Sequence, residues 1–426
     1  MDLEAATTKG EGRASTLNSG CFCTTLDRDA LAESLDRGVR RRGFAEQLIA
    51  SHPILFANVS VFAPDAAIEQ MAKVVRAVEA AAVLPEFQAA ALSWAPPIAR
   101  DSLGPLGAFM GYDFHITTQG PRLIEVNTNA GGGFLNAALA QAQRACCGEP
   151  LDRSATGPAA FRQSVGDMFV HEWCLQRGAG RPGLIAIVDD APNDQHLYPD
   201  FELAKGLLED QGFEAVIADA ASLRFQDGVL MIDGRVIDLV YNRLVDFSFD
   251  EPAHVALRDA YAAGAVVVTP NPHLHALYAD KRNLVLLSDT HRLKGWGLSA
   301  DDAATLETAL PKTVRVSAEN AEALWDGRRE LFFKPARGYG SKATYRGEKV
   351  TRRVWSEITA GDYVAQAYAP PSRRGVMVDG ARTDLKVDIR LYTYAGAVLL
   401  TAARLYQGQT TNMRTPGGGF APVLRA

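Results

Sequence analysis

Two carboxylates and one amide stand at regular spacing in a short alternating stretch, Gly111 to Asn127. Gln119-Gly120-Pro121 is a turn signal between two alternating runs, so the stretch is predicted to form a β-hairpin. A turn near Gln119 places Asp113 opposite Glu125, with Asn127 two residues on and on the same face. Like charges about 5 Å apart across two strands repel unless a cation lies between them. Oxygen ligands of this kind suit Mg²⁺ that carries phosphate oxygens, so these three residues are the predicted metal ligands.

The other parity of this hairpin is apolar and is predicted to face the core; Leu123 is the apolar exception on the polar parity. Its members are Tyr112, Phe114, Ile116, Ile124 and Val126. The alternative is an ordinary hairpin whose carboxylates are solvated. The glycine-rich run that follows, up to Gly133, favours a ligand site because its backbone can approach a ligand closely. A dinucleotide-binding fingerprint is excluded here because Asn136 stands at its third glycine position.

A second group of candidate residues follows an apolar strand that ends in Lys334. A buried cation is costly unless an anion pairs with it, so this lysine is predicted to meet an anion. The amides of the following glycine-rich loop, which contains Gly338 and Gly340, could surround phosphates. The phosphate-loop pattern G-x-x-x-x-G-K-[ST] is absent from the chain, so that class of nucleotide site is excluded.

Near the C-terminus, the stretch 384–392 alternates cleanly and places Lys386, Asp388 and Arg390 on one face. The alternative to a functional face is a salt-bridged, solvated one. A turn leads to a return strand that carries Arg404. The polar, glycine-rich run 412–419 is predicted to be a lid over a site, closing at Gly417–Gly419.

Together these segments resemble an ATP-grasp ligase. The hairpin resembles the metal-binding D…E-x-N strand pair of that family, and Lys334-Pro335 resembles its nucleotide lysine strand. Asp280-Lys281 resembles a phosphate contact of the family, and Val364–Tyr368 resembles the hinge that holds adenine. Asp388-Ile-Arg390 resembles the strand whose Asp contacts ribose, and Arg404 and Asn412 resemble later polar contacts to phosphate and metal. The carboxylate hairpin precedes the lysine strand by about 200 residues, an order similar to that of circularly permuted glutathione synthetases. Gly338 stands where those enzymes carry a metal-binding Glu, so the resemblance leaves metal binding to the hairpin.

The resemblance implies ATP and Mg²⁺ as cofactors and a set of site residues. Those implied to bind the nucleotide are Lys281, Lys334, Gly338, Gly340, Gln366, Ala367, Tyr368, Asp388 and Asn412. Those implied to be catalytic are Arg390, Arg404 and Arg414. Arg243, which ends a strand at Tyr241-Asn242-Arg243, is the predicted partner of a substrate carboxylate.

The elements around these residues predict an α/β (α+β) protein. Strands alternate with helices from Leu184 to Thr269, which indicates a parallel sheet, and the chain becomes β-rich and antiparallel from about Lys312. The expected organisation is a disordered N-terminus (1–25), a helical segment with the hairpin (26–178), an α/β substrate domain (184–311) that precedes a β-rich nucleotide-binding domain (312–426), the whole resembling a circularly permuted ATP-grasp fold.

Composition limits the partners. The 426 residues carry 44 Lys and Arg against 50 Asp and Glu, and this balance gives no basic footprint for nucleic acid or a membrane surface. Five cysteines, an odd number, argue against a disulfide framework, and the first 20 residues have no apolar signal region; a cytoplasmic protein is expected. A homodimer is left open, because dimers are common in the resembled family.

The prediction that follows is an ATP- and Mg²⁺-dependent ligase that joins a small-molecule carboxylate, amino-acid or peptide-like, to an amine through an acyl phosphate. The alternative from another class is a catalytically silent ATP-binding regulatory or scaffold protein.

Overall fold

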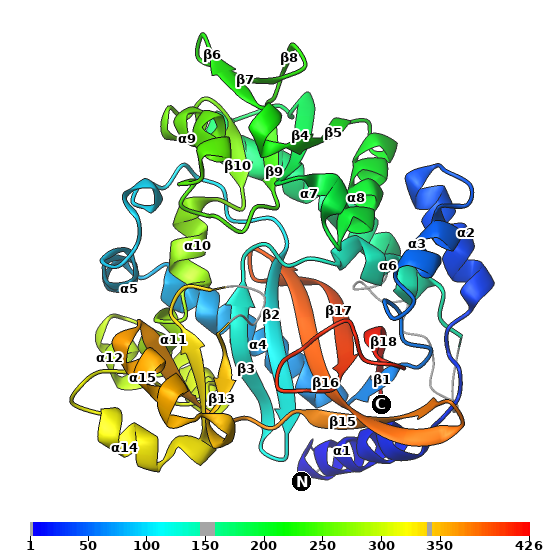
Figure 1. Cartoon of the computed structure of the whole chain (residues 1–426), viewed down its shortest axis with the longest axis vertical. Helices are drawn as coiled ribbons and strands as arrows, with labels where there is room; N and C mark the ends of the chain where they lie inside the picture. Colours follow the sequence, from blue (N-terminus) through cyan, green and yellow to red (C-terminus); the bar gives the residue numbers. More distant parts are fainter. Residues whose placement is uncertain (1–2, 145–157, 339–342) are drawn as a thin grey trace.

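The computed structural model describes residues 3–144, 158–338 and 343–426 (Figure 1). Its centre is a sheet of seven strands drawn from distant parts of the chain, in the order β1-β18-β17-β16-β2-β3, with β15 also paired to β16. All neighbours are antiparallel except β1 and β18. The strands are β1 (Val61–Ala63), β2 (Met110–Thr117), β3 (Gly120–Asn127), β15 (Ser372–Val378), β16 (Ala381–Tyr394), β17 (Ala397–Tyr406) and β18 (Gly419–Arg425).

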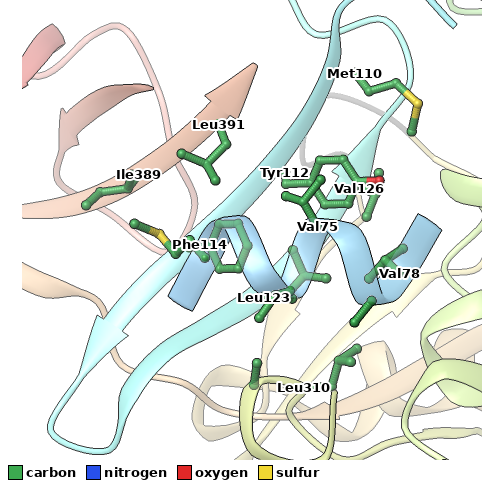
Figure 2. Packing of buried hydrophobic residues seen from close by; sticks show 14 of the residues in the cluster. Val75, Val78, Met110, Tyr112, Phe114, Leu123, Val126, Leu310, Ile389 and Leu391 are labelled. Atoms are coloured by element: carbon green, nitrogen blue, oxygen red, sulfur yellow. The ribbon is translucent and has the colours of Figure 1, made fainter. Parts of the chain in front are cut away.

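Helix α4 (Asp65–Ala82) covers one face of the central sheet (Figure 2). Its apolar residues recur at helical spacing, as its sequence predicts, and Val75 and Val78 are buried against the apolar side chains of β2, β3 and β16. The hairpin contributes Tyr112, Phe114 and Leu123 to this layer. Burial of one face of β2 and β3 fixes which side chains of the hairpin point to the other face, where the candidate ligands lie.

A parallel sheet of four strands forms a second unit, at the top of Figure 1, and confirms the predicted alternation of strands and helices. The strand order is β10-β9-β4-β5. Residues of α7 and α8 pack on one face, and residues of α9 and of the small β6-β7-β8 sheet pack on the other. The bounds are α7 (Pro158–Arg177), β4 (Leu184–Asp189), α8 (Tyr198–Asp210), β5 (Glu214–Asp219), β6 (Arg224–Gln226), β7 (Val229–Ile232), β8 (Arg235–Val236), β9 (Leu239–Asn242), α9 (Val255–Ala262) and β10 (Val267–Thr269).

The segment that follows β10 belongs to the central core. Helices α10 (Pro272–Tyr278), α11 (Asn283–Leu287), α12 (Thr290–Gly295) and α13 (Ala300–Ala309) place their leucines in the cluster that α4 forms with the central sheet. The parallel-sheet unit therefore ends near Thr269, and residues 272–309, which the sequence groups with it, pack elsewhere.

The predicted lysine strand lies in a third, four-stranded antiparallel sheet of order β11-β14-β12-β13. Trp355 and Ile358 of helix α15 pack with Phe333 and Val316 in its core. The elements are β11 (Thr313–Arg315), α14 (Ala321–Asp326), β12 (Leu331–Pro335), β13 (Tyr345–Arg346), α15 (Arg352–Ala360) and β14 (Tyr363–Ala367). The remaining helices are α2 (Arg28–Val39), α3 (Phe44–Ser51), α5 (Pro85–Leu92) and α6 (Gly133–Gln141).

The predicted disorder of the N-terminus (1–25) is wrong for the described residues 3–25, because helix α1 (Leu3–Gly20) forms there. The side chain of Asn18 bonds both the N–H and the carbonyl of Phe62. The buried Arg374 of β15 donates to the carbonyls of Asn18 and Cys21. These anchors come from residues 44 to 356 positions away, which local composition does not reveal.

Among the described residues, no helix combines the length and the apolar character that crossing a bilayer requires.

Candidate active site

The hairpin forms as predicted, with β2 and β3 joined by a tight turn and Asp113 opposite Glu125. The register shifts between Asp113 and Phe114, because Leu123, and not Ile124, pairs with Phe114. Ile124 is thus the extra residue of a β-bulge. The bulge explains why Leu123 is fully buried in the core, and it makes the prediction of Ile124 as a core residue wrong, since Ile124 lines a cavity instead.

Three adjacent strands place a buried charge cluster beside the hairpin. Strand register sets Arg390 opposite Asp113 and Arg404 opposite Asp388. Arg390 donates to both oxygens of Asp113, at 2.5 and 2.6 Å, and Arg404 bridges Asp113 and Asp388 at 2.7 and 2.6 Å. Burial opposes ionisation of Asp113, but the two guanidinium charges outweigh it and lower its pKa to about 2. The predicted catalytic arginines Arg390 and Arg404 are therefore ion-paired here.

Asp388 has one carboxylate oxygen without a partner. Its Oδ2 accepts from Arg404 and from the hydroxyl of Thr411, whereas its buried Oδ1 has no hydrogen-bond partner in the described part of the chain. Burial, with the nearby charge of Asp113, raises the pKa of Asp388 to about 6 despite Arg404. A buried acceptor left unbonded is costly, so this atom is available to a ligand hydroxyl or a cation.

Lys334 is buried at the end of β12, but its hydrogen-bond partners in the described part of the chain are neutral groups and not the anion that the sequence predicts. Its ammonium donates to the bulge carbonyl of Ile124 and to Oε1 of Gln366, both at 2.9 Å. Burial lowers the pKa of Lys334 to about 8, although the charge of Glu125 opposes this. The bulge therefore joins the metal-ligand hairpin to the lysine strand.

Glu125 faces the same space. Burial alone would raise its pKa, but the charges of Lys281 and Lys334 outweigh it and lower the pKa. Asn127 donates from Nδ2 to Asp113 at 3.1 Å and to Glu125 at 3.4 Å.

These side chains surround a cavity of about 100 Å³, which we call the first cavity. The predicted site residues that line it are Asp113, Glu125, Asn127, Lys281, Lys334, Gly338, Gln366, Ala367, Tyr368 and Asp388. The described cations of this region are Lys281, Lys334, Lys386, Arg390 and Arg404, against the carboxylates Asp113, Glu125 and Asp388. Five positive against three negative groups give an excess of two positive charges, which suits a polyanion such as a magnesium-bound nucleoside triphosphate.

The hinge residues reach this cavity, but their amides are engaged. The N–H groups of Ala367 and Tyr368 donate to the carbonyls of Lys312 and Glu330, both at 2.8 Å. A base bound here would meet the side chains and carbonyls of the hinge. Phe332 and Tyr368 offer a flat wall, with ring centroids 6.5 Å apart and planes 13° from parallel.

Some predicted site residues do not line the first cavity. Asn412 bonds within its own loop, to Gln407, Thr410, Arg414 and Thr415. Arg414 is exposed. Arg243 is buried and donates to the carbonyl of Asn129 and the hydroxyl of Tyr241, beneath the loop that follows β3. Gly340 lies outside the described residues.

The run predicted to be a lid, 412–419, is a loop up to Gly418, and the residues just before it, Thr410 and Thr411, line the first cavity; its closing function stays a prediction. Gly419 begins β18, and a Cβ there would lie 2.3 Å from the carbonyl oxygen of Ile54; one at Gly418 would lie 2.4 Å from that of Leu405. Gly418 and Gly419, at the end of this run, allow a close approach of backbones where the loop enters the sheet.

Sequence reasoning missed further residues of the site. Lys386 lines the first cavity, and its ammonium donates to the carbonyl of Gly408. Lys386 stands two residues before Asp388 and therefore on the same face of the strand, which is the feature of the sequence that could have assigned it to the site. Thr410 and Thr411, just before Asn412, line the cavity in its stead.

A second, larger cavity of about 650 Å³ adjoins the first and shares Asn127, Lys281 and Gly338 with it. Residues of the parallel-sheet unit, including Asp190 and Phe247, form its far wall. The two cavities thus meet at Asn127, one of the predicted metal ligands, and at Lys281 and Gly338.

The donor set fits Mg²⁺, with one revision. The carboxylate of Asp113 is saturated by arginines, whereas Glu125 and Asn127 keep oxygens that face the cavity. No cluster of three or more His, Cys, Asp or Glu suited to a metal occurs among the residues that the structure describes. Mg²⁺ is commonly held by one or two protein oxygens together with substrate phosphates, so this sparse set agrees with a metal that arrives with its nucleotide.

The lowered pKa of Lys334 predicts a pH-dependent nucleotide affinity. Its ammonium must be protonated to offset phosphate charge, so affinity falls as pH rises through about 8. We expect Mg²⁺-AMPPNP to bind about tenfold more weakly at pH 9 than at pH 7, measured by calorimetry. Lys334→Arg stays charged over this range and should give a flat profile; a flat profile in the wild type would contradict the prediction.

Comparison with family models finds no match, and comparison with curated proteins finds none. Among solved structures, a glutathione synthetase-like effector from Globodera pallida in its apo form is similar over 94% of this chain and 98% of its own, with a TM-score of 0.55 and 12% identity. A putative γ-glutamylcysteine synthetase from Methylobacillus flagellatus is similar over 81% of this chain and 85% of its own, with a TM-score of 0.47 and 10% identity. D-alanyl-alanine synthetase A from Vibrio cholerae is similar over 54% of this chain and 75% of its own, with a TM-score of 0.30 and 12% identity.

The likeness to the effector extends over nearly the whole of both chains and concerns the fold. It agrees with the mixed α/β, ATP-grasp-like fold that the motifs predict. The circular permutation stays a prediction.

Proposed function

We propose that this protein is an ATP- and Mg²⁺-dependent ligase that joins a carboxylate to an amine through an acyl phosphate. The observation that carries the proposal is the first cavity, where Glu125 and Asn127 lie with Lys281 and Lys334, although up to about 200 residues separate them. A chain that only needed a stable core would gain nothing from burying these charges together. The ligases among the structural neighbours agree with this class of reaction.

Each group has a role in that reaction. Oxygens of Glu125 and Asn127 would hold Mg²⁺, which supplies charge stabilisation to the transferring phosphoryl group. Lys281 and Lys334 offset the charge of the phosphates, and the bulge carbonyl of Ile124 fixes the direction of the Lys334 ammonium. Phosphoryl transfer depends on such positioning and charge stabilisation rather than on a covalent protein group.

The proposed chemistry would occur where the two cavities meet, at Asn127, Lys281 and Gly338, a place that we call the joint. A substrate carboxylate there gains the γ-phosphoryl group, ADP leaves, and an amine then attacks the acyl carbon and expels phosphate while losing one proton. Arg337 and Lys281 line the second cavity beside the joint and would orient the carboxylate.

The test has two stages. Calorimetry with AMPPNP, with and without Mg²⁺, measures nucleotide binding; ADP release from Mg²⁺-ATP is then measured across mixtures of amino acids, dipeptides and amines. We expect metal-dependent binding and substrate-dependent ADP release. Nucleotide binding without turnover on any mixture would favour a silent regulatory or scaffold protein, and no metal-dependent binding would contradict both functions.

A further inference from the structure

The second cavity has a polarised lining. Its end beside the first cavity carries Lys281 and Arg337, the latter held by the carbonyl of Trp94. Asp280 also lines this end, but its carboxylate is neutralised by the ion pair with Arg282. The far end of the cavity is lined by four acidic residues of the parallel-sheet unit, and no described Lys or Arg lines that end. The four are Asp190, Asp246, Asp250 and Glu251.

Two of these acids are held in place by a histidine. His254 is completely buried, and its two ring nitrogens meet Asp190 at 2.7 Å and Asp246 at 2.9 Å. An imidazole flanked by carboxylates on both nitrogens must donate from both, so it carries one positive charge. Four carboxylates and one imidazolium leave an excess of three negative charges at this end.

Three of the four acidic side chains keep carboxylate oxygens that can accept a hydrogen bond from a ligand. Asp246 uses its oxygens for His254 and for the N–H groups of Ser248 and Glu251. The side-chain carboxylates of Asp250 and Glu251 have no hydrogen bond or ion pair within the described ranges, and the side chain of Asp190 is 45% exposed. These three side chains are open to a ligand.

The rest of the lining is uncharged and combines apolar side chains with the polar Thr128, Asn129 and Ser248. The ring of Phe247 stacks on that of His275, with centroids 4.0 Å apart and planes 8° from parallel. Burial, with the charges of Lys281 and Arg337, lowers the pKa of His275 to about 3, so this ring is neutral. Val245 and Pro272 extend the apolar wall. A chain of methylene groups would pack against these apolar side chains.

We propose that the second cavity binds the amine substrate and that this substrate is an aliphatic diamine or polyamine, with its second ammonium group at the acidic end. This assignment rests on the proposed ligase function, which places the reacting amine at the joint of the cavities. The reacting nitrogen must be unprotonated when it attacks, whereas an acidic environment stabilises a protonated amine. The reacting nitrogen therefore does not lie at the acidic end. The acidic end instead neutralises a second nitrogen that stays protonated.

Direct binding tests the proposal without knowledge of the carboxylate. Cadaverine and pentylamine have the same carbon chain and differ only in the second ammonium group. We expect protein loaded with Mg²⁺-AMPPNP to bind cadaverine at least tenfold more tightly than pentylamine at low salt, by calorimetry. The variant D250N/E251Q should reduce cadaverine affinity about tenfold and leave pentylamine unchanged.

A matched control removes the same charge elsewhere. Glu307 on α13 and Glu322 on α14 are exposed and line neither cavity, so E307Q/E322Q should leave cadaverine binding unchanged. Equal binding of cadaverine and pentylamine, or an equal effect of the two double variants, would overturn the diamine assignment. Because Mg²⁺-AMPPNP binding is measured on the same samples, its absence in the wild type would instead contradict the proposed function.

Discussion

Replacing Glu125 by glutamine is expected to lower Mg²⁺-dependent ADP release about 10²- to 10³-fold while the protein remains folded. Glutamine keeps the size of the side chain and an oxygen that can accept from Asn127, but it removes the charge that two lysines stabilise. A hard cation binds an amide oxygen less strongly than a carboxylate, and the phosphates would lose their bridge to the protein.

The rate loss is measured with a coupled ADP assay over a range of Mg²⁺ concentrations, and folding by thermal denaturation. E322Q, an isosteric change at an exposed position on α14, serves as the control. Unchanged rate and unchanged Mg²⁺ dependence in E125Q would rule out this cavity as the metal site.

Replacing Arg390 by methionine is expected to lower the free energy of unfolding by about 3–5 kcal/mol. The variant removes the bidentate partner of Asp113 and leaves Arg404, which Asp388 shares, as the described cation paired with this buried carboxylate. In the wild type the lowered pKa of Asp113 gives stability that is present above the unfolded pKa of about 4 and is lost as pH falls towards 2. The variant should lose this contribution, so its deficit is largest near neutral pH.

Urea denaturation at pH 7 measures the loss. The control is Arg382→Met on the same strand, since Arg382 is exposed and pairs with the exposed Asp384; we expect a change below about 0.5 kcal/mol there. Adding Asp113→Asn to Arg390→Met should restore part of the lost stability, because it removes the unpaired charge. A loss below about 1 kcal/mol for Arg390→Met would contradict the view that the cluster is a buried ionic unit.

Alternation, together with the turn near Gln119, predicted the two most informative local features. The parity of β2 and β3 identified which side chains leave the core, and it placed Asp113 opposite Glu125. The one exception in the alternating pattern, Leu123, results from the bulge. A bulge adds a residue to one strand relative to its partner, so the pattern of a single strand does not reveal it.

Which strands become neighbours was beyond local pattern. Asp113 meets Arg390 because β16 pairs with β2 across more than 270 residues. That contact converts a predicted metal ligand and a predicted catalytic arginine into an ion pair. Residue types alone suggested that Asp113 binds a metal and that Arg390 acts in catalysis. Only the register of the sheet shows that the two side chains pair with each other.

Glycine-rich segments were the least reliable guide. The same composition that permits a mobile loop also permits two backbones to touch, and Gly418 and Gly419 do the latter. The N-terminal helix shows the same limit, since Asn18 and Arg374 hold it through contacts that no local window contains.

The way in which the central sheet is assembled has a kinetic consequence. Strand β1 pairs only with β18 in the sheet order, and the register joins Val61 to Val423. On the ribosome, β1 therefore waits for most of the chain to be synthesised before its partner exists, whereas the parallel unit between Leu184 and Thr269 can form earlier from contiguous sequence. Until β18 arrives, β1 and β17 each present an unpaired edge, so the growing chain is most prone to aggregate during this interval.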